Sequence, residues 1–249
     1  MTTFFVHWGY YEGLSHSVAL AESVNGCKSC VISDPPIGVA AEELFAAIKR
    51  HKKDINFNLN FFSIARWFTV LSIARTFSSK RWPIFIADWD MLIFARLQES
   101  LAPFLDFDIG RTVNHPNAGD ASAAYYIRSV DVLEAFCSEL QWLANNDSPL
   151  LIGIQDMSAW SLVAHKRNLK VADLTEIQNG STFDHNIHAG DGIYVMDGRA
   201  KQITWRDGVP FFKLLSGEPV RANVVHCWGS YKNREWELCN HHYNKITST

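Results

Sequence analysis

Short apolar runs alternate with stretches of helical periodicity in the first half of the chain, and this alternation limits the folds open to it most strongly. Residues 2–8 and 28–33 are typical of buried strands, and the apolar residues of 14–25 recur between them at helical spacing. Further helices are predicted over residues 40–53 and over residues 61–77, which are apolar nearly all round. The alternation predicts an α/β fold with a mostly parallel central sheet flanked by helices.

The second half continues this pattern and then changes character. The next predicted strand and the two predicted helices cover residues 123–128, 130–145 and 154–167. Short antiparallel pieces are predicted at 190–195 and 202–205, because the Asp-Gly pairs at 197–198 and 207–208 are typical of hairpin turns. Since no repeat, low-complexity segment or linker separates the parts, we expect a small antiparallel annex within one domain that spans residues 1–249.

Composition and charge narrow the class of protein. The net charge of the 249 residues is -3, so the chain lacks the basic field that non-specific nucleic-acid binding requires, and we expect no nucleic-acid partner. Five cysteines form no even disulfide framework, which favours a reducing compartment. No basic leader precedes an apolar stretch, and no run reaches the roughly 20 apolar residues of a membrane-spanning helix. We therefore expect a cytoplasmic protein without a transmembrane segment, for which peripheral contact with a membrane stays open.

Two aspartates, Asp88 and Asp90, directly follow the apolar run of residues 82–87. Residues i and i+2 of a strand point to the same face, so these two carboxylates can converge on one point. Hard divalent ions such as Mg²⁺ and Mn²⁺ take carboxylate oxygens and leave positions for substrate phosphates. A bare Asp-x-Asp is also common in solvated turns, so the metal interpretation depends on what else lies nearby.

A histidine ends another apolar run near the carboxyl end of the chain. His226 follows residues 222–225 and precedes Gly229 and Lys232. A neutral imidazole can complete the coordination of a cation, Gly229 would let the backbone approach a phosphate, and Lys232 could neutralise a diphosphate. The structural alternative is a hydrogen-bonded core histidine followed by a tight turn.

Three stretches are expected to meet at one edge of the sheet. Ligands of open α/β sheets bind beyond the carboxyl ends of the strands. Trp8 with Gly9, Asp34, and the pair Asp88 and Asp90 each come just after a predicted strand. The sequence therefore predicts one cleft at that edge.

Together these segments resemble the nucleotide-sugar-dependent glycosyltransferases of the A-type fold with an Asp-x-Asp motif, particularly bacterial enzymes that build lipopolysaccharide and capsule. The resemblance covers most of the chain, and the segments that carry it are residues 4–9, 31–34, 85–90 and 226–232 and the helix that contains Arg66. It implies a Rossmann-like domain with a nucleotide-binding half over about residues 1–95 and an acceptor-side half over about residues 96–249.

The resemblance also implies an activity. It implies that a sugar passes from a nucleoside-diphosphate sugar, a UDP-sugar in the simplest case, to a hydroxyl of a glycan or glycolipid acceptor, with Mn²⁺ or Mg²⁺ as cofactor. Asp88, Asp90 and His226 would be the metal ligands. The residues implied to hold the donor are Trp8, Gly9, Asp34, Arg66, Asp88, Gly229 and Lys232.

Two further aspartates are candidates for the chemistry on the sugar or the acceptor. Asp156 lies in a stretch that resembles the opening of a helix beside the donor sugar, and Asp184 lies in a stretch that resembles a substrate-side loop. Each has a structural alternative: a helix cap for Asp156 and an Asx turn for Asp184. The sequence leaves open whether transfer would retain or invert configuration, and which carboxylate would act on the acceptor.

Two other functions stay open from the sequence. A metal-dependent nucleotidyltransferase could use the same aspartates, but it usually needs a basic glycine-rich loop after the first strand, and residues 8–13 contain no Lys or Arg. A non-catalytic carbohydrate-binding protein could use the many aromatic side chains for stacking on sugars. That second interpretation gives no reason for the aspartate pair or for His226.

Overall fold

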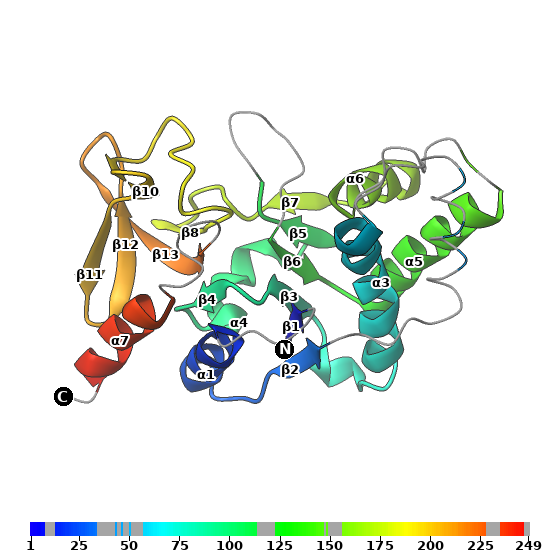
Figure 1. The fold of residues 1–249 in the computed structure, drawn as a ribbon, viewed down its shortest axis with the longest axis horizontal. Helices are drawn as coiled ribbons and strands as arrows, with labels where there is room; N and C mark the ends of the chain where they lie inside the picture. The colour runs from blue at the N-terminus through cyan, green and yellow to red at the C-terminus, as the bar shows by residue number, and fades with distance from the viewer. Residues whose placement is uncertain are drawn as a thin grey trace.

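A six-stranded mixed sheet forms the centre of the fold (Figure 1). The computed structural model describes residues 1–7, 13–33, 43, 46, 50, 57–113, 123–146, 148, 156–227 and 235–246. In the order β2-β1-β3-β6-β5-β7, the strands are β2 Cys30–Ser33, β1 Thr2–His7, β3 Ile84–Asp88, β6 Ala124–Ile127, β5 Ile109–Arg111 and β7 Val171–Asp173. The predicted α/β class is confirmed.

The sheet is less parallel than the alternating sequence pattern predicts. Strand β1 pairs in parallel with β2 and β3, and β5 pairs in parallel with β7. Strand β6, however, runs antiparallel to both of its neighbours, β3 and β5. Because β6 is buried on both faces, its sequence has the continuous apolar character of a parallel strand and does not reveal its direction.

The first three strands end at one edge of this sheet. Residue Val6 of β1 is in register with Asp88 of β3, and His7 is in register with Ser33 of β2. The carboxyl ends of β1, β2 and β3 therefore lie side by side. Of the predicted elements, the segments with Trp8, Gly9 and Asp34 and most of the helix at 40–53 lie outside the described residues.

A second sheet forms the annex, on the left of Figure 1. Its order is β11-β12-β13-β4, with strands β11 Ile203–Arg206, β12 Val209–Lys213, β13 Pro219–His226 and β4 Met91–Ile93; β8 Ser181–Phe183 pairs with β13 in parallel. Strand β4 begins three residues after β3 ends, so the chain passes from the first sheet to the second between them. A separate hairpin joins β9 Met196–Asp197 to β10 Ala200–Lys201.

The predicted antiparallel pieces are only partly found. The predicted strand at 202–205 corresponds to β11, which forms a hairpin with β12, and the turn residues Asp207 and Gly208 both have positive φ, as two-residue hairpin turns require. Of residues 190–195, residues 191–193 form turns, and Tyr194 makes only an isolated antiparallel bridge with Leu214. Asp191 and Gly192 have φ of 51° and 72°, which an extended backbone does not allow.

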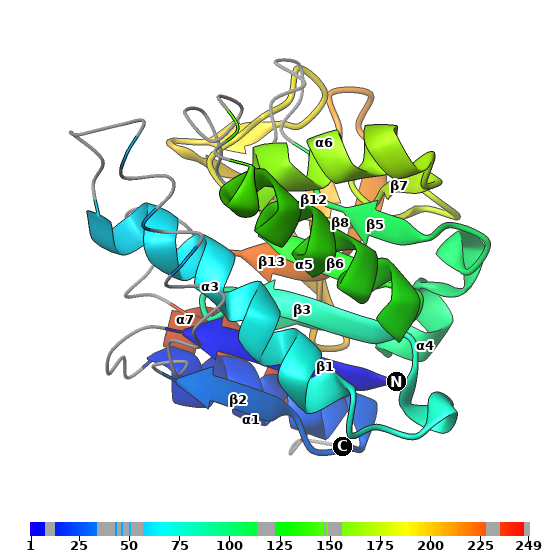
Figure 2. The same cartoon turned by 90° about the vertical axis from the view of Figure 1, so that its right-hand side faces the viewer.

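Helices cover the central sheet. Helices α3 Phe57–Ala74, α5 Val130–Asn145 and α6 Asp156–Arg167 lie together over one face (Figure 2). Helix α1 Gly13–Asn25 packs beside β4 and α7 Glu235–Ile246, and α4 Leu97–Ser100 follows β4. Two short 3₁₀ helices span Ser79–Arg81 and Ala102–Phe104. None of the helices in the described ranges has both the length and the apolar character needed to cross a bilayer.

The apolar character of α3 follows from its position between the sheet and two helices. Trp67 of α3 is fully buried and makes edge contacts with Tyr125 of β6, Phe136 of α5 and Trp160 of α6, at ring-centroid distances of 4.9, 5.4 and 5.1 Å. Phe136 and Trp160 stack on each other at 3.8 Å. This aromatic cluster anchors α3, which carries Arg66 next to Trp67.

We expect Gly208→Ala to destabilise the protein more than Gly198→Ala. Both glycines have positive φ, which costs an L-residue roughly 1–2 kcal/mol. A Cβ at Gly208 would also lie 3.1 Å from the carbonyl oxygen of His242 in α7, whereas a Cβ at Gly198 would meet nothing within 4 Å. Thermal unfolding of the two variants measures the difference. Equal melting temperatures would contradict close packing of this turn against α7.

Candidate functional site

Asp88, Asp90 and His226 meet at the junction of the two sheets. One ligand atom from each of the three side chains lies within 4.8 Å of the others. The pairing of β13 with β4 brings them together, because His226 at the end of β13 is in register with Met91 at the start of β4. The Cys227 backbone N–H also donates to the Asp90 carbonyl oxygen at 2.9 Å. The structure therefore places a histidine from the end of the chain beside two aspartates from its middle.

The two aspartates converge differently from the sequence prediction. Asp88 is the last residue of β3, but Trp89 and Asp90 form the turn before β4, so Asp90 does not share a strand face with Asp88. The reason is the change of sheet, since the chain must turn after Asp88 for β4 to pair with β13. Asp88 remains partly exposed, with 32% of its side chain accessible, while the Asp90 side chain is buried at 3%.

The three side chains fit a divalent cation of the Mg²⁺ or Mn²⁺ class. Such a cation lies about 2.1 Å from its ligands, so it holds them no more than about 4.2 Å apart. The three ligand atoms lie within 4.8 Å of one another, so a small inward movement of the side chains would bring them to that separation. Two carboxylate oxygens and one imidazole nitrogen also leave positions open for other oxygen ligands.

Arg66 supplies a positive charge to this acidic group. Its Nη1 donates to Oδ1 of Asp88 at 2.5 Å, and the Arg66 side chain is only 10% exposed. Burial raises the pKa of Asp88, and the nearby Asp90 raises it too, while Arg66 and His226 oppose the shift. A bound cation would offset the negative charge that the two carboxylates share beyond what Arg66 neutralises. Contact of Arg66 with the donor, as the resemblance implies, stays a prediction.

His226 has one ring nitrogen engaged and the other directed at the aspartates. Its Nδ1 lies 2.5 Å from the carbonyl oxygen of His185, which can only accept, so Nδ1 carries the proton of the neutral ring. Its Nε2 lies 3.3 Å from Oδ1 of Asp90. In this tautomer the Nε2 lone pair faces the candidate cation position. A ring held in this way is typical of metal-binding histidines.

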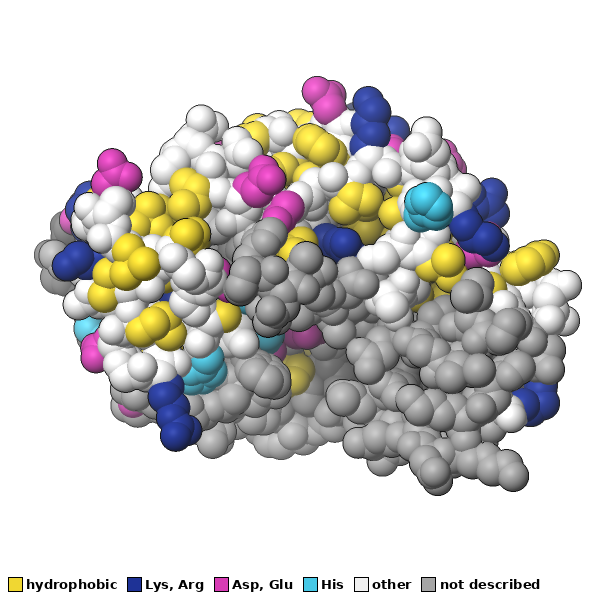
Figure 3. Space-filling model, turned by 90° about the horizontal axis from the view of Figure 1, so that it is seen from above, with side chains coloured by type: hydrophobic (Ala, Val, Ile, Leu, Met, Phe, Trp, Pro, Cys, Tyr) yellow, Lys and Arg dark blue, Asp and Glu magenta, His cyan; other side chains and the backbone are white. Residues whose placement is uncertain are grey.

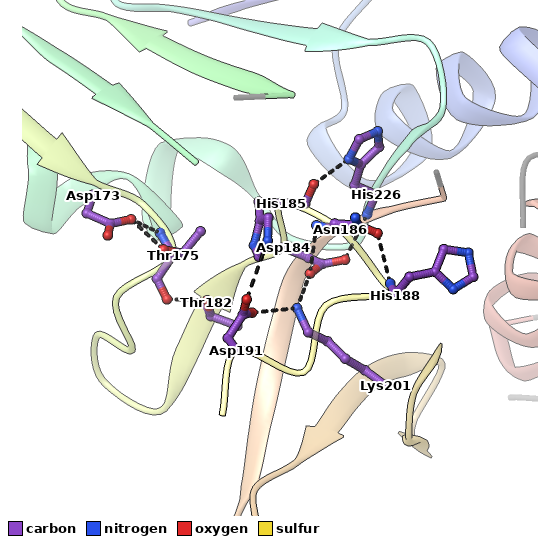
Figure 4. Close-up of polar contacts among 10 residues, drawn as sticks. All are labelled: Asp173, Thr175, Thr182, Asp184, His185, Asn186, His188, Asp191, Lys201 and His226. Atoms are coloured by element: carbon purple, nitrogen blue, oxygen red, sulfur yellow. Dashed lines mark hydrogen bonds and ion pairs between the residues drawn. The ribbon is translucent and has the colours of Figure 1, made fainter. Parts of the chain in front are cut away.

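A group of buried charges lies behind His226 (Figure 4). Lys201 contacts Asp184 at 2.6 Å and Asp191 at 3.2 Å, and the exposed fractions of these side chains are 2%, 0% and 8%. His185 lies 3.5 Å from Asp191. No local pattern identifies Lys201, Asp191 and His185 as members of one group, because only the fold brings them together. Of this group, the sequence predicted a functional role for Asp184 alone.

The remaining predicted site residues are placed as follows. All described contacts of Asp184 are internal, so a sugar hydroxyl would have to displace Lys201 to reach it; the predicted substrate contact stays a prediction. Helix α6 begins at Asp156, as the sequence suggested, but its side chain is outside the described part. Trp8, Gly9, Asp34, Gly229 and Lys232 also lie outside the described residues, and their roles stay predictions.

A cavity of about 360 Å³ lies elsewhere in the annex. Arg96, Ser181, Arg221 and Asn223 contribute to its lining, and none of the candidate metal ligands does. Arg221 and His226 are five residues apart on β13, which corresponds to about 16 Å along a strand. The cavity is therefore separate from the candidate metal centre.

The upper face of the molecule is hollowed near its middle, where acidic and histidine side chains are visible (Figure 3). Among the described residues on this face, Lys and Arg side chains are scattered and do not gather in one patch. That distribution agrees with the low net charge of -3.

Comparisons with known proteins support the fold. No protein-family model and no curated protein matches this sequence. Among solved structures, the chain is similar to a glycosyltransferase involved in the glycosylation of the major capsid of PBCV-1, with a TM-score of 0.52 and 12% identity over 96% of this chain and 98% of that chain. It also aligns with the galactosyltransferase LgtC in complex with donor and acceptor sugar analogs, with a TM-score of 0.46 and 11% identity over 96% and 95% of the two chains. A third similar structure is mouse xyloside xylosyltransferase 1, with a TM-score of 0.42 and 11% identity over 73% and 88%.

At 12% identity, the similarity to the PBCV-1 glycosyltransferase shows a shared fold and nothing about substrate or mechanism. The predicted A-type glycosyltransferase fold is thereby confirmed, with a mixed central sheet flanked by helices and a smaller second sheet.

Proposed function

We propose that this protein is a divalent-metal-dependent glycosyltransferase that moves a sugar from a nucleoside-diphosphate sugar, with UDP as the expected nucleotide, to a hydroxyl of a glycan or glycolipid. The observation that carries this proposal is the meeting of Asp88, Asp90 and His226 at the carboxyl end of β3. In open α/β sheets that edge is where ligands bind. Phosphate oxygens could complete the coordination that these three side chains begin.

Each described residue of the site has a distinct task in this proposal. Asp88 and Asp90 would offer carboxylate oxygens to Mn²⁺ or Mg²⁺, and His226 would offer Nε2. Arg66 would hold Asp88 in place and limit the negative charge of the site when no cation is bound. When bound, the cation would supply Lewis-acid stabilisation of the leaving diphosphate.

Residues outside the described part would complete the donor site. Lys232 and Gly229 would contact the diphosphate, and Trp8, Gly9 and Asp34 would contact the nucleoside. If transfer inverts configuration, a carboxylate such as Asp156 must accept the proton of the attacking hydroxyl; if it retains configuration, a carboxylate would stabilise the sugar cation instead.

The proposal is tested by a hydrolysis screen over nucleotide sugars. Slow cleavage of the donor by water reveals the nucleotide and the sugar before the acceptor is known. We expect release of a nucleoside diphosphate in the presence of Mn²⁺ or Mg²⁺ and none after chelation. Release of pyrophosphate from a nucleoside triphosphate and a sugar phosphate would support a nucleotidyltransferase. Binding of free glycan without nucleotide or metal would support a carbohydrate-binding protein.

The pKa of His226 predicts how metal binding depends on pH. Burial lowers this pKa, but Asp90 beside Nε2 and the nearby Asp88 raise it, and the net effect is a pKa above the ordinary 6.5. A proton on Nε2 excludes a cation, so the affinity for Mn²⁺ with UDP should fall by up to about tenfold per pH unit below that pKa. Calorimetric titrations between pH 5.5 and 8.5, a range of about three units around neutrality, measure this slope.

The stability of the metal-free protein should depend on pH in the opposite direction from the metal affinity. Protonated His226 pairs with Asp90, so this contribution to stability is fully present below 6.5 and is lost as the pH rises through the raised pKa. The variant His226→Gln should lose both dependences. If it keeps the wild-type pH dependence of metal affinity, another group must control it.

A further inference from the structure

Residues 184–187 wrap around His226 and engage almost every polar group it has. The Asp184 carboxylate accepts the His226 backbone N–H at 3.2 Å, the His185 carbonyl oxygen contacts Nδ1 at 2.5 Å, and the Ile187 N–H donates to the His226 carbonyl at 3.1 Å. Only Nε2 is left to face Asp90. The orientation of this imidazole therefore depends on where residues 184–187 are held.

Lys201 holds residues 184–187 in place through contacts of its side chain and its backbone. Its Nζ contacts Oδ1 of Asp184 at 2.6 Å and Oδ2 of Asp191 at 3.2 Å, and its backbone N–H donates to the Ile187 carbonyl at 2.8 Å. The ammonium also lies 4.6 Å from the centroid of the Tyr194 ring. The long lysine side chain is thus fixed at both of its ends.

The charge on Lys201 allows Asp184 and Asp191 to stay buried as carboxylates. Asp184 has no exposed side-chain surface and Asp191 has 8%, so neither carboxylate can rely on water for its solvation. Oδ1 of Asp184 accepts Lys201 and the Asn186 N–H, and Oδ2 accepts the His226 N–H. Without the lysine, two nearby buried carboxylates would repel each other, and the segment would have to move.

We propose that Asp184 is a positioning residue for the candidate metal ligand His226: its carboxylate, neutralised by Lys201, holds the His226 backbone N–H, and neither residue touches the metal position. This inference rests on the proposed function only in assuming that His226 binds a cation. Residues that orient a metal-binding histidine typically change metal affinity by 10–100-fold, roughly, when they are replaced. Asp184 is assigned this role as a positioning residue acting through the backbone of His226.

Two matched double variants separate positioning from charge burial. Asp184→Asn with Lys201→Met, and Asp184→Ala with Lys201→Met, both remove the buried pair and leave Asp191 in the same state. They differ in the side-chain amide at position 184, which offers one acceptor oxygen and one NH2 donor and fills more space than the alanine methyl. The asparagine carbonyl can take the place of Oδ2 of Asp184 and accept the N–H of buried His226, while the Asn186 N–H, which Oδ1 accepts in wild type, loses that acceptor in both variants.

The first measurement is hydrogen exchange of the His226 amide in metal-free protein, by NMR. We expect faster exchange in the alanine double variant than in the asparagine one, while amides in α5 exchange equally in both. The second is calorimetric binding of Mn²⁺ in the presence of UDP. We expect the asparagine double variant to lie within about threefold of wild type and the alanine one to bind about tenfold more weakly.

Equal exchange rates of the His226 amide in the two double variants would overturn the proposed positioning role. So would equal affinities for Mn²⁺ with UDP. If wild type itself fails to bind Mn²⁺ with UDP, the proposed function fails, but the exchange rates in metal-free protein still decide the positioning role.

Discussion

Replacing Asp90 with alanine should abolish the stabilisation of this protein by UDP and Mn²⁺. A ligand at one hundred times its Kd stabilises the native state by about 2.7 kcal/mol, which for a chain of this length raises the melting temperature by roughly 5–10 °C. Asp90 is the most deeply buried of the three candidate ligands, at 2% exposure, and its Oδ1 lies 3.3 Å from Nε2 of His226. Without its carboxylate, only Asp88 and His226 remain, and the former is already paired with Arg66.

The measurement is a thermal-unfolding series with UDP, with Mn²⁺ or Mg²⁺, and with both. Wild type should shift only when nucleotide and metal are present together, and the Asp90→Ala variant should not shift. An exposed aspartate, Asp106, provides the control, since Asp106→Ala should keep the full shift. A metal-dependent shift that survives in Asp90→Ala would remove this residue from the ligand set.

Replacing Lys201 with methionine should be the most destabilising change at the back of the site. Removing one partner of a buried ion pair typically costs about 3–5 kcal/mol, because the other charge stays buried without compensation. Here two carboxylates, Asp184 and Asp191, would be left. Burial lowers the pKa of Lys201, but both aspartates raise it and prevail, so the lysine is charged at neutral pH. The expected loss corresponds to roughly 6–20 °C in melting temperature.

Lys166→Met is the matched control for this prediction. Lys166 also pairs with a buried carboxylate, Glu139, but 37% of the lysine side chain is exposed, and Arg167 lies 3.7 Å from the same carboxylate. The Lys166→Met substitution should therefore lower the free energy of unfolding by about 1 kcal/mol or less. A similar melting temperature for the two variants would show that the buried position of Lys201 gives its charge no special importance. Adding Asp184→Asn to Lys201→Met should recover part of the loss, since it removes one of the unpaired charges.

The sequence predicted those features of the fold and site that depend on local pattern. The helix expected over residues 130–145 is α5 with the same bounds, because its apolar positions follow one face and Ser129 precedes it as an extended residue. Asp88 and His226 were found because each ends a buried apolar run, although the two runs belong to different sheets.

The features that escaped prediction depend on long-range pairing. The apolar run after Asp90 looks like a continuation of β3, and nothing local shows that β4 joins the other sheet through β13. Strands of three residues, such as β5, β7 and β8, are too short for periodicity to identify. A lysine is normally exposed, so Lys201 gave no sign that its charge is buried between two aspartates from another part of the annex.

The passage of the chain from β3 to β4 has a mechanical consequence. Asp88 belongs to one sheet, His226 ends a strand of the other, and Asp90 sits in the two-residue link between them. A cation bound by all three side chains would connect the two sheets and would oppose movement of one sheet against the other. Nucleotide and metal should therefore sharpen the unfolding transition as well as raise its midpoint, because the two sheets would then come apart only together.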